Sequence, residues 1–186
     1  MEISRVVGRD FTTFFKDIQH QRRGYISTFL EEALDILLIL NETNVCHRDF
    51  LPSNIIVVEE NGRSKVGLID FGWAIENGKT DIAHPLHLGG HYRAKDRDSD
   101  LYTLGSLLLE QWYDLPYIRR IAKVLRSNEV LSVSEQKQAL INAKKKISIP
   151  FTPYDELRLF LRRHQRPRMI INAVKRKISK MVKNEI

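Results

Sequence analysis

The sequence predicts an α+β fold that is mostly α-helical and contains one small β-hairpin. Residues 26–43 place apolar side chains at three- and four-residue intervals, which is the spacing of an amphipathic helix. Residues 54–70 hold two β-branched apolar runs on either side of Asn61-Gly62, a pair that favours a tight hairpin turn. Further amphipathic segments follow in the C-terminal half. Helices packed around one hairpin are therefore the expected outline.

Helices are predicted on both sides of this hairpin. The start of the long helix is indicated by Ser27, with Glu31 four residues later. After the hairpin, residues 73–97 are expected to be irregular, because they contain three glycines and a proline. The predicted helices span residues 8–18, 26–43, 98–114, 116–126, 133–146, 154–163 and 168–183.

The composition is that of an ordinary folded domain. A chain of 186 residues can bury a proper core. The single cysteine, Cys46, excludes an internal disulfide framework and suits a reducing compartment. The first residues lack the apolar core of a signal peptide, and the longest apolar run, residues 36–40, is too short to cross a bilayer. We therefore expect a soluble, cytoplasmic protein.

The net charge of +7 is concentrated at the C-terminal end. Residues 162–186 hold nine of the 30 Lys and Arg residues but only one of the 23 acidic residues, so the rest of the chain is nearly neutral. From residue 169 onward the apolar side chains share one helical face, and they are Ile170, Ile171, Val174, Ile178, Met181 and Val182. Residues 169–186 are thus predicted to form a basic amphipathic helix.

Two uses fit such a helix. Lys and Arg beside an apolar face are typical of a segment bound to an anionic membrane surface, which would place the protein at the cytoplasmic face. The alternative is a last helix of the domain with a solvated charged face. Nucleic-acid binding is disfavoured, because no aromatic residues alternate with the basic ones.

Two short phrases carry the chemistry. In "HRDFLPSN", residues 47–54, Asp49 is followed by Asn54, and in "IDFG", residues 69–72, Asp70 ends another apolar run. Two carboxylates and an amide suit phosphoryl transfer, in which one carboxylate acts as base while the other groups hold Mg²⁺ against phosphate. Gly72 lets the backbone turn away from the metal ligand.

These phrases resemble motifs of the protein kinase superfamily. "HRDFLPSN" and "IDFG" are similar to its catalytic and metal-binding loops, and "GGHYRAKDRDSDLYTLGSLLLE", residues 89–110, is similar to the end of its activation segment and the helix that follows. Three motifs in the family's order and spacing make the resemblance specific. It covers residues 1–168 and implies the helical C-terminal lobe of the kinase fold, with residues 169–186 as an appended helix.

The resemblance also implies roles for the residues of these motifs. Asp49 would be the catalytic base, acting together with Asn54. Asn54 and Asp70 would bind Mg²⁺ and, through it, ATP. Four residues would support this set: His47 beneath the metal loop, Arg48 facing a phosphate or an acid of the activation segment, Gly72, and Asp100 bonded to the catalytic-loop backbone.

The N-terminal lobe of the kinase fold has no counterpart in the sequence. Upstream of Asp49 there is no Gly-rich phosphate loop and no strand lysine for the nucleotide phosphates. The chain is therefore expected to be a fragment, to depend on a partner chain that supplies this lobe, or to use ATP poorly.

Three functions stay open on the sequence alone. The leading one is an ATP- and Mg²⁺-dependent phosphotransferase acting on a hydroxyl acceptor. The second is a non-catalytic, kinase-like module that binds and regulates a partner. The third is a sugar, lipid or lipopolysaccharide kinase of the same superfold, which Leu51 and Gly89 favour, because they replace the Lys and Thr with which the family handles a peptide hydroxyl.

Overall fold

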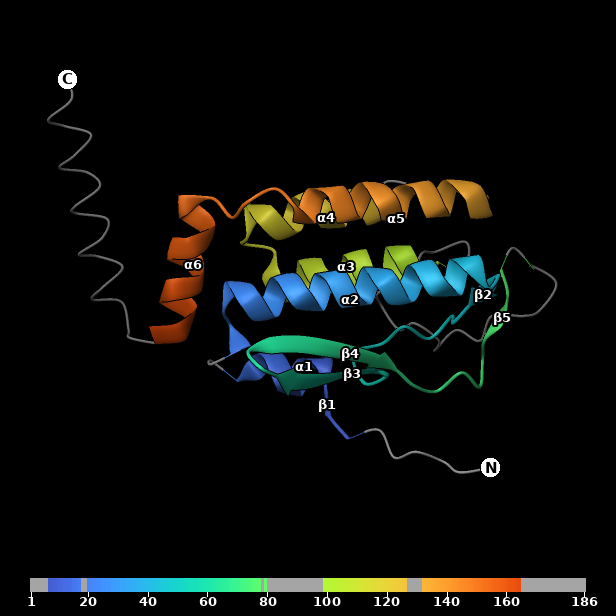
Figure 1. Cartoon of the computed structure of the whole chain (residues 1–186), viewed down its shortest axis with the longest axis horizontal. Coiled ribbons are helices and arrows are strands. Elements are labelled where there is room, and N and C mark those ends of the chain that lie inside the picture. The colour runs from blue at the N-terminus through green and yellow to red at the C-terminus, as the bar shows by residue number, and fades with distance from the viewer. Residues whose placement is uncertain (1–6, 18–19, 78, 80–98, 127–131, 165–186) are drawn as a thin grey trace, which may run out of the picture.

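Long helices dominate the structure, as the sequence predicts. The computed structural model describes residues 7–17, 20–77, 79, 99–126 and 132–164. Its elements are β1 (Arg9–Asp10), α1 (Phe11–Lys16), α2 (Arg23–Glu42), β2 (Val45–Cys46), β3 (Ile55–Glu60), β4 (Arg63–Leu68), β5 (Ile75–Glu76), α3 (Asp100–Trp112), α4 (Pro116–Arg126), α5 (Val133–Ile147) and α6 (Pro153–His164). Figure 1 shows α2 running through the middle, with α4 and α5 on one side and the hairpin with α1 on the other. The predicted α+β class, mostly helical, is confirmed.

Helix α2 is the centre of the core. Its apolar stripe is fully buried and consists of Ile26, Phe29, Leu30, Ala33, Leu34 and Leu37. The helix starts at Arg23, one turn earlier than Ser27, and no side chain caps it. The predicted start was wrong because Tyr25 and Ile26 are buried against neighbouring elements. Tertiary packing of an apolar face thus extends the helix beyond its capping signal.

The predicted hairpin is present, with one additional strand. β3 and β4 pair antiparallel from Ile55↔Leu68 to Glu60↔Arg63. Asn61 and Gly62 both have positive φ, as a two-residue turn of this hand requires. β1 pairs with the free side of β3, giving the order β1-β3-β4. The helix predicted from residue 8 therefore begins only at Phe11, where the Asp10 carboxylate accepts a hydrogen bond from Thr13 N at 3.0 Å.

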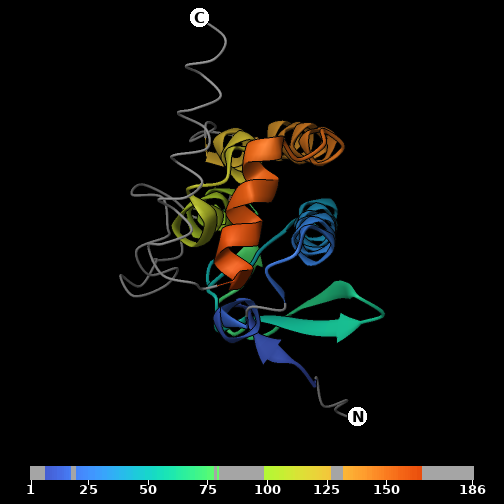
Figure 2. The same cartoon turned by 90° about the vertical axis from the view of Figure 1, so that its left-hand side faces the viewer.

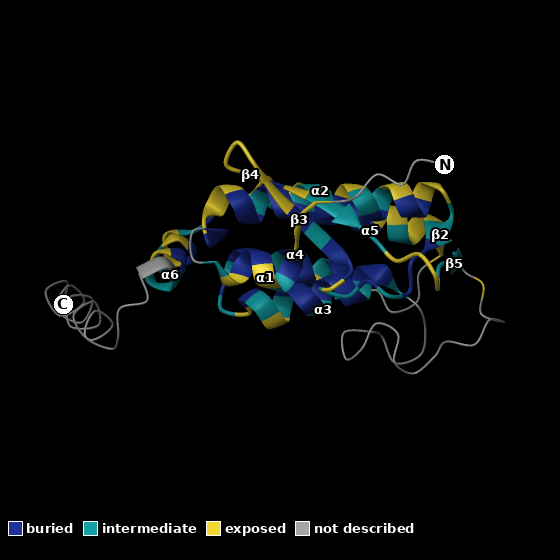
Figure 3. Ribbon diagram, turned by 90° about the horizontal axis from the view of Figure 1, so that it is seen from below, coloured by how far each residue is buried: buried dark blue, intermediate teal, exposed yellow. Residues whose placement is uncertain are grey.

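The second half packs as helices around α2 and α3. Gly105 of α3 allows close approach of α4, because a Cβ there would lie 2.7 Å from Arg126 Cγ and 3.1 Å from Leu125 Cβ. The first turn of α5 carries a capping box between Ser132 and Glu135. Helix α6 lies across the end of the bundle, as Figures 1 and 2 show. Figure 3 shows buried positions on the inward faces of the helices and exposed ones at the hairpin tip.

Some predicted features lie outside the described residues. These are the basic helix at residues 168–183, the position of Gly89 and most of the stretch predicted to be irregular. Within that stretch, Ile75–Glu76 form β5, so its first part was wrongly predicted. No helix among the described residues has the length and apolar content needed to cross a bilayer. The cytoplasmic location and the contact of residues 169–186 with a membrane stay predictions.

A polar cluster fastens the hairpin to the first two helices. The ring of His20 is buried, and its Nε2 lies 2.8 Å from Glu59 Oε2. The hydroxyl of Tyr25 donates a hydrogen bond to the other oxygen of Glu59. The second ring nitrogen of His20, Nδ1, lies 2.9 Å from the carbonyl oxygen of Phe14. Glu59 therefore ties β3 to α2 and to the segment that follows α1.

Acid is expected to weaken the folded state through Glu59. Hydrogen bonds from Tyr25 and then His20 stabilise its carboxylate, so they hold the pKa of Glu59 below its ordinary value of 4.5. This stabilisation is complete above pH 4.5 and is lost as the pH falls through the folded-state pKa, because the unfolded chain takes up the proton first. Urea unfolding at neutral pH and at a pH below 4.5 measures the loss. The loss of unfolding free energy between the two pH values should be smaller in Glu59→Gln than in the wild type, and intermediate in Tyr25→Phe. A loss in Glu59→Gln equal to that of the wild type contradicts the prediction.

Candidate functional site

Two loops lie side by side because two pairs of strands flank them. The first loop, residues 47–54, connects β2 to β3, and the second, residues 69–74, connects β4 to β5. β3 pairs with β4, and β2 pairs with β5 through Cys46↔Ile75. Both ends of the two loops are thereby held together. Between them, Ile69 N donates a hydrogen bond to Asn54 O at 3.0 Å.

Asp49 and Asn54 are joined directly. The Nδ2 of Asn54 donates to Asp49 Oδ2 at 2.8 Å and to Asp49 O at 2.9 Å. The backbone closes the same turn, because Leu51 N donates to Asp49 O and Asn54 N donates to Leu51 O. Asn54 is buried, with 8% of its surface exposed. Asn54 Oδ1 accepts a long hydrogen bond from Ser53 Oγ, at 3.4 Å, and its second lone pair can still act as a ligand.

Asp70 lies on the second loop, one residue after the link to Asn54. Asp70 is exposed, and its backbone φ is 63°, in the left-handed region. Gly72 N donates to Asp70 Oδ1 at 3.4 Å, and a Cβ on Gly72 would lie 3.3 Å from that oxygen. The positive φ thus belongs to Asp70, while Gly72 leaves room for its carboxylate.

Left-handed backbone occurs in both loops. Among the described non-glycine residues, four have positive φ, and three of those are Asn or Asp, which adopt it more readily than other residues. Asp70 is one of these three, and Arg48 of the first loop is the fourth. For Arg48 a left-handed conformation costs about 1–3 kcal/mol and persists where surrounding contacts impose it. The contacts of the first loop therefore hold Arg48, next to Asp49, in this conformation.

Asp100 is the main anchor of the first loop. At the start of α3, its Oδ2 accepts a hydrogen bond from His47 N at 2.7 Å, and its Oδ1 accepts one from Arg48 N at 3.0 Å. Burial raises the pKa of Asp100, and the two N–H groups act in the opposite direction. The family resemblance implied this hydrogen-bonding partner, and the structure shows both bonds.

His47 and Arg48, at the start of the first loop, are both buried. The ring of His47 is fully buried; its Nε2 lies 3.0 Å from Ile69 O, and it contacts the ring of Phe71 edge to face at 4.7 Å. His47 therefore links the first loop to the second. Arg48 is 3% exposed. The activation segment that it is predicted to face lies outside the described residues, so that role stays a prediction.

The oxygen donors of the site fit magnesium shared with phosphate. In the described ranges, no group of three or more His, Cys, Asp and Glu residues could hold a metal ion by itself. Mg²⁺ prefers oxygen ligands and commonly takes one or two from protein, with phosphates and water as the rest. Asn54 Oδ1 and the Asp70 carboxylate are donors of this kind, and their role as ligands stays a prediction.

No pattern in the sequence indicated the contacts that close the site at its far end. β2 and β5 are two residues each, too short for any periodic pattern. Asn77, which follows β5, donates its backbone N–H to Asn44 O at 2.8 Å. Its side chain exchanges two hydrogen bonds with Gln136 of α5. No sequence signal marks such a pair, because single amides far apart in the chain form no motif.

Comparison with known proteins identifies relatives over part of the chain. No protein-family model matches it. It is 30% identical over 108 residues to Aurora kinase B of Danio rerio, covering 52% of this chain and 32% of that protein. It is 29% identical over 112 residues to the serine/threonine-protein kinase mph1 of Schizosaccharomyces pombe, covering 48% and 16%. It is 24% identical over 139 residues to a probable serine/threonine-protein kinase, the MRK1 homolog of Encephalitozoon cuniculi, covering 70% and 43%.

The chain spans less than half the length of each of these relatives. All three are named as kinases. Together with the three sequence motifs, these matches show that the chain is related to the protein kinase superfamily.

Proposed function

We propose that the chain is the C-terminal lobe of a protein-kinase-like phosphotransferase, which moves the γ-phosphoryl group of ATP to a hydroxyl acceptor with Mg²⁺. The observation that carries the proposal is the direct bond between Asn54 Nδ2 and Asp49 Oδ2, at 2.8 Å. It joins the two residues expected to serve as base and metal ligand. One backbone hydrogen bond away, the loop of Asp70 brings the second carboxylate.

Each residue of this set has a distinct task. Asp49 keeps its carboxylate oriented through Asn54, and it would accept the proton of the attacking hydroxyl. Asn54 Oδ1 and Asp70 would hold Mg²⁺, which supplies neutralisation of the phosphate charge when bound. The N–H groups of His47 and Arg48 donate to Asp100, and Ile69 N donates to Asn54 O, so both loops are held in place before any substrate arrives.

The remaining half of a nucleotide site would come from elsewhere. We propose that a Gly-rich loop and a strand lysine are supplied by a further part of the polypeptide or by a partner chain. The relatives are named as serine/threonine kinases, which favours a protein hydroxyl as the acceptor.

Leu51 favours a second candidate, a kinase acting on a glycan or lipid hydroxyl. Its side chain packs against the core two residues after Asp49 and offers no charge to a peptide substrate. Phosphorylation assays with protein, glycan and lipid acceptors separate the two candidates.

Binding of MgATP tests the proposal. Calorimetry on the chain should detect binding, and Asp70→Ala should weaken it by about 10- to 100-fold, the usual effect of losing one strong interaction with a charged group. Asp35→Ala is the matched control, because Asp35 is an exposed carboxylate of α2 that pairs with Lys144, away from the two loops. Its affinity should equal that of the wild type.

One result would contradict the proposal directly. Equal binding by wild type and Asp70→Ala would remove Asp70 from the metal site. Absence of binding in both would show that the chain builds no nucleotide site by itself, so that the test must be repeated with the further part of the polypeptide or the partner chain proposed above.

A further inference from the structure

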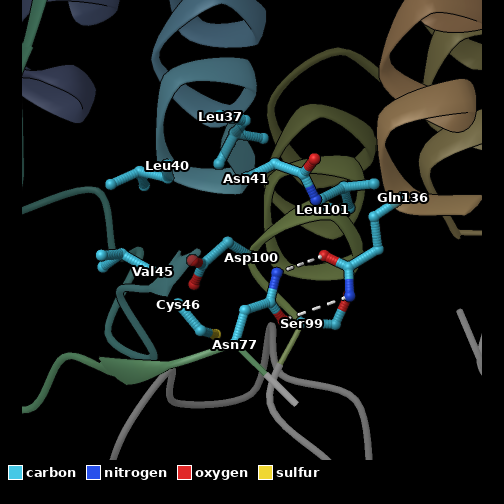
Figure 4. A pocket seen from close by; sticks show the side chains of 10 residues that line it. All are labelled: Leu37, Leu40, Asn41, Val45, Cys46, Asn77, Ser99, Asp100, Leu101 and Gln136. Carbon is cyan, nitrogen blue, oxygen red and sulfur yellow. Dashed lines mark hydrogen bonds between the residues drawn. The ribbon is translucent and has the colours of Figure 1, made fainter. Parts of the chain in front are cut away.

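A reciprocal pair of amides connects helix α5 to the far end of the candidate site. Asn77 Nδ2 donates to Gln136 Oε1 at 3.2 Å, and Gln136 Nε2 donates back to Asn77 Oδ1 at 3.3 Å. Figure 4 shows the two side chains facing each other, with both bonds drawn. Two parallel hydrogen bonds fix the relative orientation of the amides as well as their separation.

Each partner is itself held firmly. The N–H of Asn77 donates to Asn44 O at 2.8 Å, and Asn44 Nδ2 donates to Glu76 Oε1 at 3.1 Å. On the other side, the first turn of α5 is tied to the end of α2, because Asn41 Nδ2 donates to Val133 O at 3.0 Å. The amide pair therefore joins two fixed points of the fold.

The pair also borders a small cavity of mixed polar and apolar lining next to Asp100. The centre of a water molecule could move within a volume of about 10 Å³ in this cavity, so it can hold at most one water molecule. Among its lining residues are Cys46, Asn77, Ser99, Asp100 and Gln136 (Figure 4). The residues that anchor the first loop and the residues that end the second loop thus meet around one space.

From these contacts we infer that Asn77 and Gln136 are positioning residues for the proposed phosphotransfer site. Through β5 and its pairing with β2, the amide pair holds the end of the Asp70 loop against the start of the Asp49 loop. Its loss would let the two loops shift relative to each other. The expected change in nucleotide affinity rests on the proposed function. The expected change in hydrogen exchange of the Asp70 loop rests on the fold alone.

Isosteric variants in the full chain test the inference. Gln136→Met and Asn77→Leu each remove both hydrogen bonds while keeping most of the side-chain volume. Gln138→Met is the matched control, because Gln138 is an exposed residue of the same helix, and its amide donates to Asn142 within that helix at 3.2 Å. The double exchange Asn77→Gln with Gln136→Asn keeps two amides and the same number of methylene groups, and it should rescue the pair.

The first measurement is hydrogen exchange at two amides of the Asp70 loop. Ile69 N–H bonds to Asn54 O, and Ala74 N–H bonds to Phe71 O. In either single variant these amides should exchange about three- to tenfold faster, the effect of losing hydrogen bonds of ordinary strength. The amide of Arg119, bonded to Leu115 O in α4, serves as an internal reference and should not change.

The second measurement is the Kd of MgATP in the same variants. It should rise by about three- to tenfold in the single variants, stay unchanged in Gln138→Met and return toward the wild-type value in the double exchange. Faster exchange confined to the start of α5, with unchanged exchange at Ile69 and Ala74, would overturn the inference. The amide pair would then stabilise the packing of α5 without positioning the loops. If the wild type binds no MgATP, this chain alone builds no nucleotide site, and exchange at Ile69 and Ala74 alone decides the positioning role.

Discussion

Replacing Trp112 by alanine is expected to lower the free energy of unfolding by about 3–5 kcal/mol. Trp112 is fully buried at the end of α3. Its indole lies 4.9 Å from the ring of Phe15 and 5.6 Å from that of Phe11, both edge to face. Its Nε1 donates to Gln21 Oε1 at 3.0 Å. The substitution would leave a large cavity between α1, α2 and α3, together with a buried acceptor without its donor.

The neighbouring residue supplies the control. Tyr113 is 70% exposed, so Tyr113→Ala should change the free energy of unfolding by no more than about 0.5 kcal/mol. Urea unfolding followed by far-ultraviolet circular dichroism measures both variants without depending on the deleted indole. A loss below about 1 kcal/mol in Trp112→Ala would mean that α1 does not pack on α3 as described.

Replacing Asp100 by alanine is expected to have the second large effect, about 2–6 kcal/mol. The reason is that the buried N–H groups of His47 and Arg48 would both lose their acceptor, and each unsatisfied donor costs about 1–3 kcal/mol. Removal of a buried carboxylate offsets part of this cost, because burial disfavours its charge. The first loop of the candidate site would therefore lose its main anchor.

A graded series checks this expectation. Asp100→Asn retains one side-chain oxygen and should lie between the wild type and Asp100→Ala in unfolding free energy. Asp35→Ala removes a surface carboxylate paired with Lys144 and should cost less than about 1 kcal/mol. The amide proton resonances of His47 and Arg48 should shift in both Asp100 variants. Unshifted resonances would show that Asp100 does not hold the loop.

The long helices and the hairpin could be predicted because each is a periodic pattern or a strong turn signal. Helix α4 begins and ends where its amphipathic segment does. The start of α2 could not be located, because burial of Tyr25 and Ile26 overrides the capping signal at Ser27. β1, β2 and β5 are two residues long, and their pairing depends on distant partners rather than on local sequence.

The proximity of the two loops was predictable, and so was the contact of Asp100 with the first loop, but the contacts at the far end of the site were not. The motifs that contain Asp49, Asn54 and Asp70 suggested that these residues act together, and the structure places their loops side by side. The bond between Asn77 and Gln136 joins residues 59 positions apart, and no pattern in the sequence relates them. Supports of this kind follow from the way helices pack, which becomes visible only in three dimensions.

The two tryptophans give the chain two separate optical signals. Trp112 is enclosed by aromatic rings in the core, so its fluorescence should be blue-shifted and protected from iodide. Trp73 is 44% exposed and follows Asp70 by three residues, so iodide should quench it. The core and the candidate site thus carry distinguishable native fluorophores, and occupancy of the site can be followed by light without attaching a dye.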